Sequence, residues 1–162
     1  MNKEMHLLSL RPVTEATAAF LISAVSWLYP WWGEPEGYSR EEVRTMMENS
    51  CEKQRFPRTY GLYFGETLIG MFQFTLSDMD IRPNIYPWLA NLFIDPAYRE
   101  KGYSEFLIRS VQAEAERAGL QELFLYTAHV GLYERYGWEF VGEIDTFRKT
   151  PRMQRLYRLK IK

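Results

Sequence analysis

The pattern of apolar and polar positions changes repeatedly along the chain between the two-residue period of strands and the spacing of amphipathic helices. Strand patterns are predicted over Met5–Arg11, Thr59–Phe64, Thr67–Leu76, Trp88–Ile94, Glu122–Thr127, Trp138–Ile144 and Met153–Ile161. Helical patterns are predicted over Pro12–Leu28, Ser39–Lys53, Gly102–Ala118 and Gly131–Tyr136. Strands and helices therefore interleave, which is typical of a mixed α/β fold.

Residues at the ends of these segments support the same boundaries. Thr14 can cap the first helix, and Ser39 with Glu42 has the spacing of a capping box for the second. The dipeptide 65–66 is typical of a tight β-hairpin, and Gly119 suits the C-terminal cap of the third helix. We find no repeat, low-complexity tract or linker, so residues 1–162 are expected to form a single domain with one sheet of about seven strands.

The segment from Trp88 to Ile108 carries the most chemical information. An almost continuously apolar strand, typical of a central position in a sheet, is followed by an Asp-Pro stop, a basic turn and an amphipathic helix. The first backbone N–H groups of a helix have no intrahelical partner, and the helix dipole adds partial positive charge there. Gly102 would let a bulky pyrophosphate approach the backbone. A glycine that only turns the chain is the alternative at this point.

Two motifs give this junction a family context. The stretch DPAYREKGYS resembles motif A of the GNAT acetyltransferase superfamily, R/Q-x-x-G-x-G/A, with matches at Arg99 and Gly102 and a departure at Ser104. Downstream, HVGLYERYGWEFVGE resembles the family's LYxxxGF segment, with Tyr133 in the tyrosine position and Trp138 in place of the phenylalanine. The resemblance covers nearly the whole chain and is sharpest over 88–142.

The resemblance implies a mixed, mostly antiparallel sheet flanked by about four helices, with a splay between the fourth and fifth strands. In the family, the pantetheine arm of acetyl-CoA lies in that splay, and a backbone N–H near Leu92 or Phe93 would face the thioester oxygen. The residues that this resemblance assigns to the cosubstrate are Leu92, Phe93, Ile94, Arg99, Glu100, Lys101, Gly102, Tyr103 and Ser104.

Acetyl transfer also needs an acid and a base. By resemblance, Tyr133 points its phenol at the CoA sulfur and donates to the departing thiolate, although a purely packing role is the alternative in a chain with 11 tyrosines. No general base stands out. The strand before motif A offers only Asn91, and the other candidates are Glu34, Glu36, Asp78, Asp80 and His129. A water chain, or an amine that is already neutral, would serve equally well.

The acceptor side is indicated by SWLYPWWGEPEGYS, a segment rich in aromatic residues that in the family borders the acceptor pocket. Its aromatic rings could hold an amine by cation–π attraction. The acceptor-pocket candidates are Trp27, Trp31, Trp32, Asn91 and His129. A place in the core, or a homodimer contact at Trp31 and Trp32, fits the sequence equally well.

Composition and charge limit the classes of partner that we expect and the compartment that suits the protein. With 20 basic and 21 acidic residues the chain has a net charge of -1, so we expect neither nucleic acid nor a polybasic membrane anchor as a partner. The one cysteine, Cys51, excludes an internal disulfide and suits a reducing compartment. The first residues lack the pattern of a signal peptide, which favours a cytoplasmic protein. The uncharged run Ala16–Gly33 contains polar residues and Pro30, so a membrane span is not expected.

The sequence therefore favours an acetyl-CoA-dependent N-acetyltransferase that acts on the primary amine of a small molecule or peptide by direct attack in a ternary complex, without a metal. The alternative is a CoA-binding sensor or interaction module without catalysis. The departure at Ser104 and the missing carboxylate favour this alternative, and Tyr133 opposes it.

Overall fold

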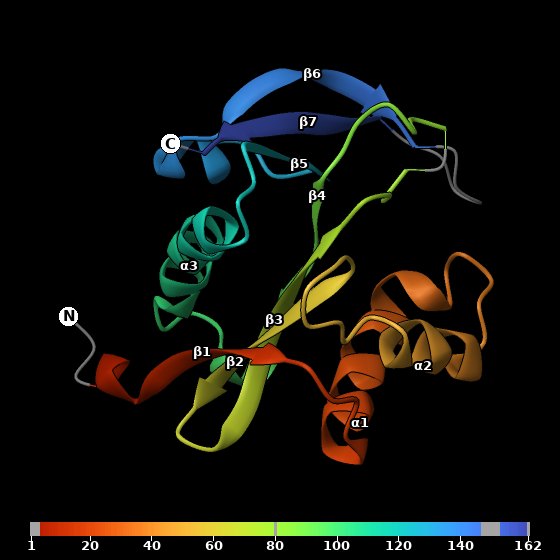
Figure 1. The fold of residues 1–162 in the computed structure, drawn as a ribbon, viewed down its shortest axis with the longest axis vertical. Helices are drawn as coiled ribbons and strands as arrows, with labels where there is room; N and C mark the ends of the chain where they lie inside the picture. The colour runs from red at the N-terminus through yellow and green to blue at the C-terminus, as the bar shows by residue number, and fades with distance from the viewer. Residues whose placement is uncertain (1–3, 80, 147–152, 162) are drawn as a thin grey trace.

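A computed structural model describes residues 4–79, 81–146 and 153–161 of the chain. Within these residues, seven strands form one sheet of order β1-β2-β3-β4-β5-β7-β6 (Figure 1). The strands are β1 Leu8–Val13, β2 Arg58–Phe64, β3 Thr67–Thr75, β4 Trp88–Ile94, β5 Glu122–Thr127, β6 Glu139–Asp145 and β7 Met153–Lys160. All neighbouring pairs are antiparallel except β4 and β5, which are parallel. The predicted mixed, mostly antiparallel sheet is confirmed.

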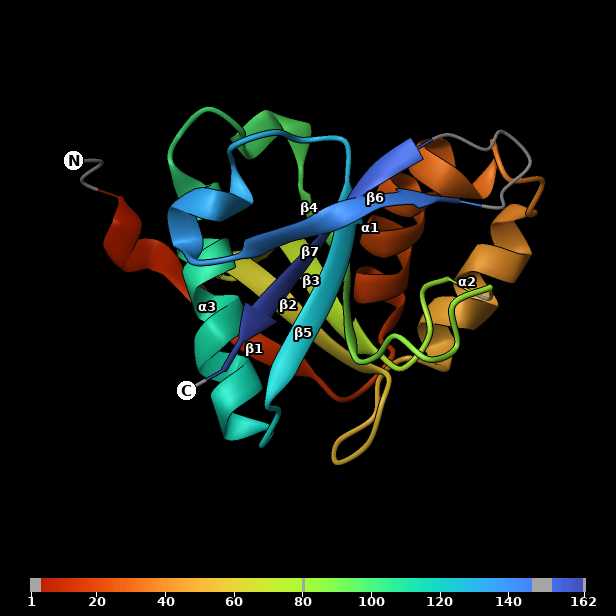
Figure 2. The same cartoon turned by 90° about the horizontal axis from the view of Figure 1, so that it is seen from above.

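Helices cover both faces of this sheet. The α-helices are α1 Ala18–Leu28, α2 Arg40–Glu48 and α3 Tyr103–Arg117, and the shorter helical turns are η1 Met5–Leu7, η2 Tyr29–Gly33, η3 Pro96–Tyr98 and η4 Tyr133–Tyr136. Both views show α3 on one side of the sheet and α1 with α2 on the other (Figures 1 and 2). The helix predicted over 131–136 is thus present as the short turn η4.

The start of the first helix was predicted too early. Residues Leu8–Val13 pair with β2 along their whole length, and α1 begins at Ala18 with Thr17 as its cap, its side chain accepting a hydrogen bond from the backbone of Phe20 at 3.2 Å. Thr14 therefore caps nothing. Pro12 is compatible with β1 because β1 is an edge strand, where a missing N–H need not break a ladder bond.

Other boundaries follow the sequence closely. The capping box of α2 is formed by both expected hydrogen bonds between Ser39 and Glu42, at 2.7 and 3.0 Å, although α2 ends at Glu48 and not at Lys53. The hairpin between β2 and β3 turns at 65–66, and Gly119 follows α3 in the left-handed conformation with φ of 75°. The predicted bounds of β4 and β5 are confirmed without change.

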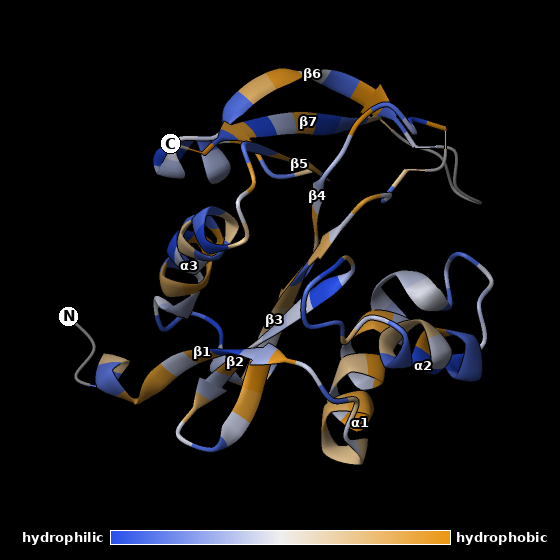
Figure 3. Ribbon diagram, viewed as in Figure 1, coloured by the Kyte–Doolittle hydropathy of each residue, from blue (hydrophilic) through white to orange (hydrophobic). Residues whose placement is uncertain are grey.

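Two apolar clusters fill the space between the helices and the sheet. On one face, Leu107, Val111 and neighbouring residues of α3 pack on β2, β3 and β5. On the other, α1 and α2 pack on β1 and β3 around Met71. Figure 3 shows nearly continuous apolar colouring along α1. Much of this helix is buried against the sheet and α2, which explains the uncharged run in the sequence. In the part of the chain that the structure describes, no helix has the length and apolar character needed to span a membrane.

Candidate functional site

The middle of the sheet opens where β4 leaves β5. Among the described residues, Trp88 and Phe124 form the one ladder pair between these parallel strands. The end of β4, from Asn91 to Ile94, is therefore bonded on the β3 side alone, and its other edge has no ladder partner on β5. This agrees with the splay that the family resemblance implied between the fourth and fifth strands.

A β-bulge lies in the same part of β4. Met71 pairs with Phe93 and Gln73 pairs with Ala90, so two residues of β4, Asn91 and Leu92, stand opposite one residue of β3. Asn91 has a positive φ of 53°, which asparagine tolerates better than most residues. A bulge of this kind reorients the peptides that follow it. The backbone near Leu92 and Phe93 is therefore turned differently from that of a regular strand.

The turn after β4 is held by its own side chains. The guanidinium of Arg99 donates from Nε to the carbonyl of Ile94 at 2.8 Å and lies 4.8 Å from the ring centroid of Phe93. The backbone then passes through two left-handed residues, Glu100 with φ of 62° and Gly102 with φ of 80°. Arg99 thus fastens the turn to the end of β4.

The N-terminus of α3 opens directly from this turn. Gly102 is the N-cap residue and offers no side chain to the first N–H groups of the helix. Among the described residues, no heavy atom beyond its chain neighbours lies within 4 Å of the position that a Cβ would take. Ser104 is exposed, whereas Tyr103 is 1% exposed and its ring lies in the core. An anion at this end of α3 would meet backbone N–H groups and the positive end of the helix dipole.

Tyr133 lies in η4, which follows β5, the strand across the splay from β4. Its side chain is 7% exposed and is flanked by the rings of Trp138 and Tyr157, with centroid distances of 5.9 and 6.0 Å. Burial raises the pKa of Tyr133 to about 12. Because this pKa lies far above neutral pH, the hydroxyl stays protonated and can donate a hydrogen bond.

The candidate acceptor residues separate into different environments. Trp27 is 7% exposed, its Nε1 donates to Asp95 at 3.2 Å and its ring stacks on Phe93 at 5.8 Å, so it has the core role that the sequence left open. Trp31 is 50% exposed and lies 5.5 Å from the same ring of Phe93. Trp32 donates from Nε1 to Oδ1 of Asn91 at 3.0 Å. The aromatic segment thus lies against the end of β4.

The general base remains unassigned. The amide of Asn91 is engaged on both sides, because its oxygen accepts from Trp32 and its nitrogen donates to Gln73 at 2.7 Å. Glu34 and His129 are exposed, Asp78 and Glu36 take part in other interactions, and Asp80 lies outside the described residues. Among the described residues, no group of three or more His, Cys, Asp or Glu side chains could hold a metal ion.

Sequence reasoning missed Gln73. It lies between Phe72 and Phe74 in β3, is 2% exposed, and bonds both Asn91 and Thr59. A lone polar residue within an apolar strand was the signal that could have found it.

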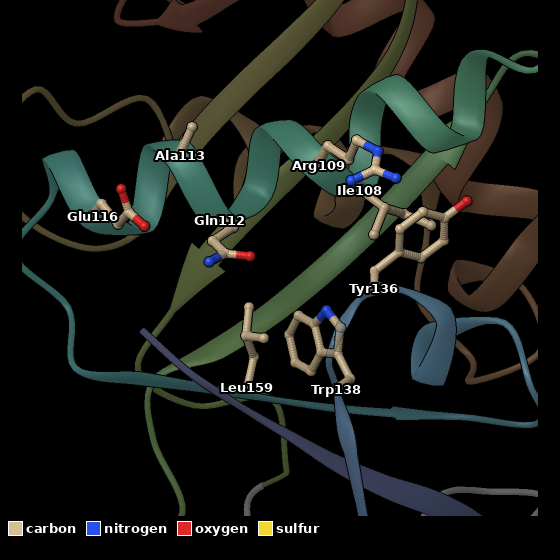
Figure 4. A pocket seen from close by; sticks show the side chains of 8 residues that line it. All are labelled: Ile108, Arg109, Gln112, Ala113, Glu116, Tyr136, Trp138 and Leu159. Carbon is tan, nitrogen blue, oxygen red and sulfur yellow. The ribbon is translucent and has the colours of Figure 1, made fainter. Parts of the chain in front are cut away.

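A separate hollow of about 270 Å³ lies along α3, away from its N-terminus. Figure 4 shows Gln112 pointing from α3 toward Leu159 and Trp138, and Arg109 beside the ring of Tyr136. The lining includes none of the residues assigned to the cosubstrate or the acceptor. This hollow is therefore not the predicted site.

Comparisons with known proteins agree with this geometry. The model of the acetyltransferase (GNAT) family matches residues 22–138. A relative, the spermine/spermidine N(1)-acetyltransferase of Bacillus subtilis (strain 168), is 28% identical over 114 residues, which cover 65% of this chain and 74% of the relative.

Solved structures share the fold over almost the whole chain. A GNAT family acetyltransferase from Elizabethkingia anophelis with acetyl-CoA bound has a TM-score of 0.65 at 14% identity, covering 96% of this chain and 99% of that one. An acetyltransferase from Salmonella typhimurium that modifies the N-terminal serine of a 50S ribosomal subunit protein has a TM-score of 0.71 at 15% identity, covering 99% of both chains.

Proposed function

The chain belongs to the acetyltransferase (GNAT) family, and we propose that it transfers an acetyl group from acetyl-CoA to a primary amine of a small molecule or peptide. One observation supports this proposal most strongly. The unpaired edge of β4 leads directly to the N-terminus of α3, where Gly102 leaves the first N–H groups of the helix without a side-chain cap. The pantetheine arm of acetyl-CoA can lie along this edge of β4, and the diphosphate joined to it can then bind at the start of α3.

In the proposed complex, the pyrophosphate of acetyl-CoA accepts hydrogen bonds from the backbone of Gly102, Tyr103 and Ser104. The dipole of α3 contributes about 0.3 to 1 kcal/mol to such binding, in addition to the hydrogen bonds themselves. Tyr103 takes part through its backbone, because its side chain is buried. The pantetheine arm follows the free edge of β4 along 91–94 and brings the thioester to the bulge.

The reaction is a direct transfer in a ternary complex. The neutral amine nitrogen attacks the thioester carbon, a C–N bond forms, and the C–S bond then breaks with its electron pair on sulfur. Negative charge on the carbonyl oxygen is stabilised by the backbone N–H of Leu92, because Phe93 pairs with Met71 of β3, and one such donor contributes roughly 3 to 4 kcal/mol in other enzymes. The proton released by the amine passes to water or to a base outside the assigned residues.

We propose that Tyr133 stabilises the leaving group, the thiolate of CoA. Its raised pKa of about 12 exceeds the pKa of an ordinary thiol, near 8.5, so complete proton transfer to the thiolate is uphill. We therefore assign Tyr133 the role of hydrogen-bond donor to the sulfur as charge develops on it.

Replacing this tyrosine tests its role. Tyr133→Phe keeps the buried ring and removes the donor, so kcat should fall by ~10²-fold while the Kd for acetyl-CoA stays the same. Tyr136→Phe, in the same short helix, is the matched control because its ring lies beside Arg109 and its hydroxyl points away from Gln112, Trp138 and Leu159 (Figure 4). An unchanged kcat for Tyr133→Phe, or an equal loss in both variants, would remove the assignment.

The acceptor we propose to test first is a polyamine, because the relative from Bacillus subtilis carries that activity in its name. Trp31 presents half of its surface, and Glu34 is exposed three residues later. A cationic chain could stack on the indole, with each cation–π contact contributing about 0.5 to 2 kcal/mol.

Release of free thiol from acetyl-CoA is the decisive assay for this function. Spermidine and spermine should give turnover, and other primary amines and peptides with a free N-terminus define the acceptor class. No thiol release with any of these amines, despite measurable CoA binding, would support the second candidate, a CoA-binding sensor. The observation that favours a sensor is that β4 has no ionisable side chain, and its one polar side chain, Asn91, is held by Trp32 and Gln73.

Three further parts of the proposal concern the setting. We propose a cytoplasmic enzyme that needs no metal, in which the exposed indole of Trp31 belongs either to the acceptor pocket or to a homodimer contact. Activity that persists after treatment with a chelator supports a metal-independent enzyme, and loss of activity contradicts it. Sedimentation of the chain and of Trp31→Ala tests the homodimer contact.

A further inference from the structure

A continuous chain of side-chain hydrogen bonds crosses the sheet beneath the bulge. Nε1 of Trp32 donates to Oδ1 of Asn91 at 3.0 Å, and Nδ2 of Asn91 donates to Oε1 of Gln73 at 2.7 Å. Nε2 of Gln73 donates to Oγ1 of Thr59 at 2.9 Å, and that hydroxyl donates to the carbonyl of Ser50 at 2.5 Å. This series of hydrogen bonds thus connects η2 to β4, β3, β2 and the segment after α2.

The direction of every bond in this chain is fixed by its two ends. The indole of Trp32 can only donate, and the carbonyl of Ser50 can only accept. The amide oxygen of Asn91 must therefore face Trp32, and the amide of Gln73 must present its oxygen to Asn91 and its nitrogen to Thr59. Gln73 and Thr59 are each 2% exposed, so water cannot easily replace a lost partner.

Asn91 is the residue that this series of hydrogen bonds holds in place. It is the left-handed residue of the bulge, and its side chain is held from both sides, by Trp32 and by Gln73. Fixing the side chain of a bulge residue also fixes the orientation of the peptides that follow it. Those peptides include the N–H group of Leu92, next to the unpaired edge of β4, whereas Phe93 pairs with Met71 of β3.

We propose that Trp32 is a positioning residue, which acts through Asn91 to aim the backbone N–H donor at the thioester oxygen. Gln73 is the buried anchor of the same arrangement. This inference rests on the proposed function, since it assumes that the N–H group of Leu92 binds the carbonyl oxygen. It connects the acceptor-side turn η2 to the strand that carries the acetyl group.

Trp32→Phe is the direct test, because it keeps an aromatic ring and removes the donor to Asn91. We expect kcat to fall about 10-fold while the Kd for acetyl-CoA stays within about twofold, since one oxyanion donor is misaligned and the phosphate site is untouched. Trp88→Phe is the matched control. Trp88 lies in β4 with Asn91 and is fully buried, and none of the described residues pairs with its Nε1, so this variant loses packing without breaking any of these hydrogen bonds. It should lose stability and keep kcat.

Changes at Asn91 test how Trp32 acts. Glycine adopts the left-handed conformation freely, so Asn91→Gly keeps the bulge without the side-chain hold, whereas Asn91→Ala loses both. We expect kcat to be lower in Asn91→Ala than in Asn91→Gly. In the Asn91→Gly background, adding Trp32→Phe should change kcat by less than twofold, because the bond is already absent.

The outcomes separate this inference from the proposed function. A wild-type chain that transfers acetyl groups, together with a Trp32→Phe variant of unchanged kcat, overturns the inference alone. Full persistence of the Trp32→Phe effect in the Asn91→Gly background, or an equal fall in kcat for Trp88→Phe, also overturns it. If Trp32→Phe does not fold, equal kcat values for Asn91→Gly and Asn91→Ala overturn it. A wild-type chain inactive with every amine overturns both.

Discussion

Two glycines at opposite ends of α3 allow a controlled test of the phosphate site. Gly102 precedes the helix with φ of 80°, and Gly119 follows it with φ of 75°. In the part of the chain that the structure describes, no heavy atom beyond the chain neighbours lies within 4 Å of a Cβ added at either position. Alanine therefore causes no clash at either end, and its cost is that of forcing an L-residue into the left-handed region, about 1 to 2 kcal/mol.

Both alanine variants should lose similar stability. For a chain of this length, each kcal/mol lowers Tm by about 2 to 4 °C. The acetyl-CoA affinity should separate them, because Gly102→Ala also disturbs the N–H groups that bind the diphosphate. A hydrogen bond to a charged group is worth about 1.5 to 3 kcal/mol, so losing one should raise Kd roughly 10- to 100-fold. Gly119→Ala should leave Kd unchanged.

Differential scanning fluorimetry and isothermal titration measure the two quantities. Acetyl-pantetheine, which lacks the diphosphate, supplies a second comparison: its kcat/KM should be the same in both variants. Equal acetyl-CoA affinities for Gly102→Ala and Gly119→Ala would refute the assignment of the diphosphate to this turn, as would a Gly102→Ala defect that is just as large with acetyl-pantetheine.

Two further predictions concern the stability of the fold around the site. Burial raises the pKa of Tyr133 to about 12, whereas the same tyrosine in the unfolded protein has a pKa near 10. The stability that protonated Tyr133 contributes is therefore complete below pH 10 and is lost as the pH rises through 12. Urea unfolding at pH 9 and 11.5 should show a loss about 2 kcal/mol larger in the wild type than in Tyr133→Phe, and parallel losses would contradict the assigned burial effect. Gly70→Ala should cost about 1 to 3 kcal/mol and slow turnover, because its Cβ would lie 2.7 Å from the carbonyl oxygen of Phe93. Gly142→Ala, with no heavy atom beyond its chain neighbours within 4 Å of its Cβ, is the control, and equal stability of the two alanine variants would count against this close contact.

The sequence predicted those elements best whose signals are local. The strand β4 is an almost continuously apolar run that begins directly after Pro87 and ends at Ile94, before Asp95, and the third helix has a glycine at each end, so their boundaries could be predicted. The start of α1 could not, because Pro12 suits the first turn of a helix as well as an edge strand. The choice was decided by the pairing of β1 with β2, about fifty residues away.

In the candidate site, too, features with local sequence signals could be predicted, and features that depend on contacts between distant segments could not. The turn at Gly102 was predicted from the strand, the glycine and the helix that follow one another in sequence, and Tyr133 came from the resemblance of its segment to the family. The role of Gln73 could not be predicted, because its partners Thr59 and Asn91 come from two other strands. The opposite treatment of the two neighbouring indoles, Trp31 exposed and Trp32 bonded to Asn91, likewise depends on packing between η2 and β4.

A crystal structure with CoA bound tests the central claim most directly. We predict that the diphosphate oxygens lie within hydrogen-bond distance of the backbone nitrogens of Gly102, Tyr103 and Ser104, with the pantetheine arm along the free edge of β4. A coenzyme bound in the hollow between α3 and β7, with the turn before α3 making no contact to phosphate, would contradict the account.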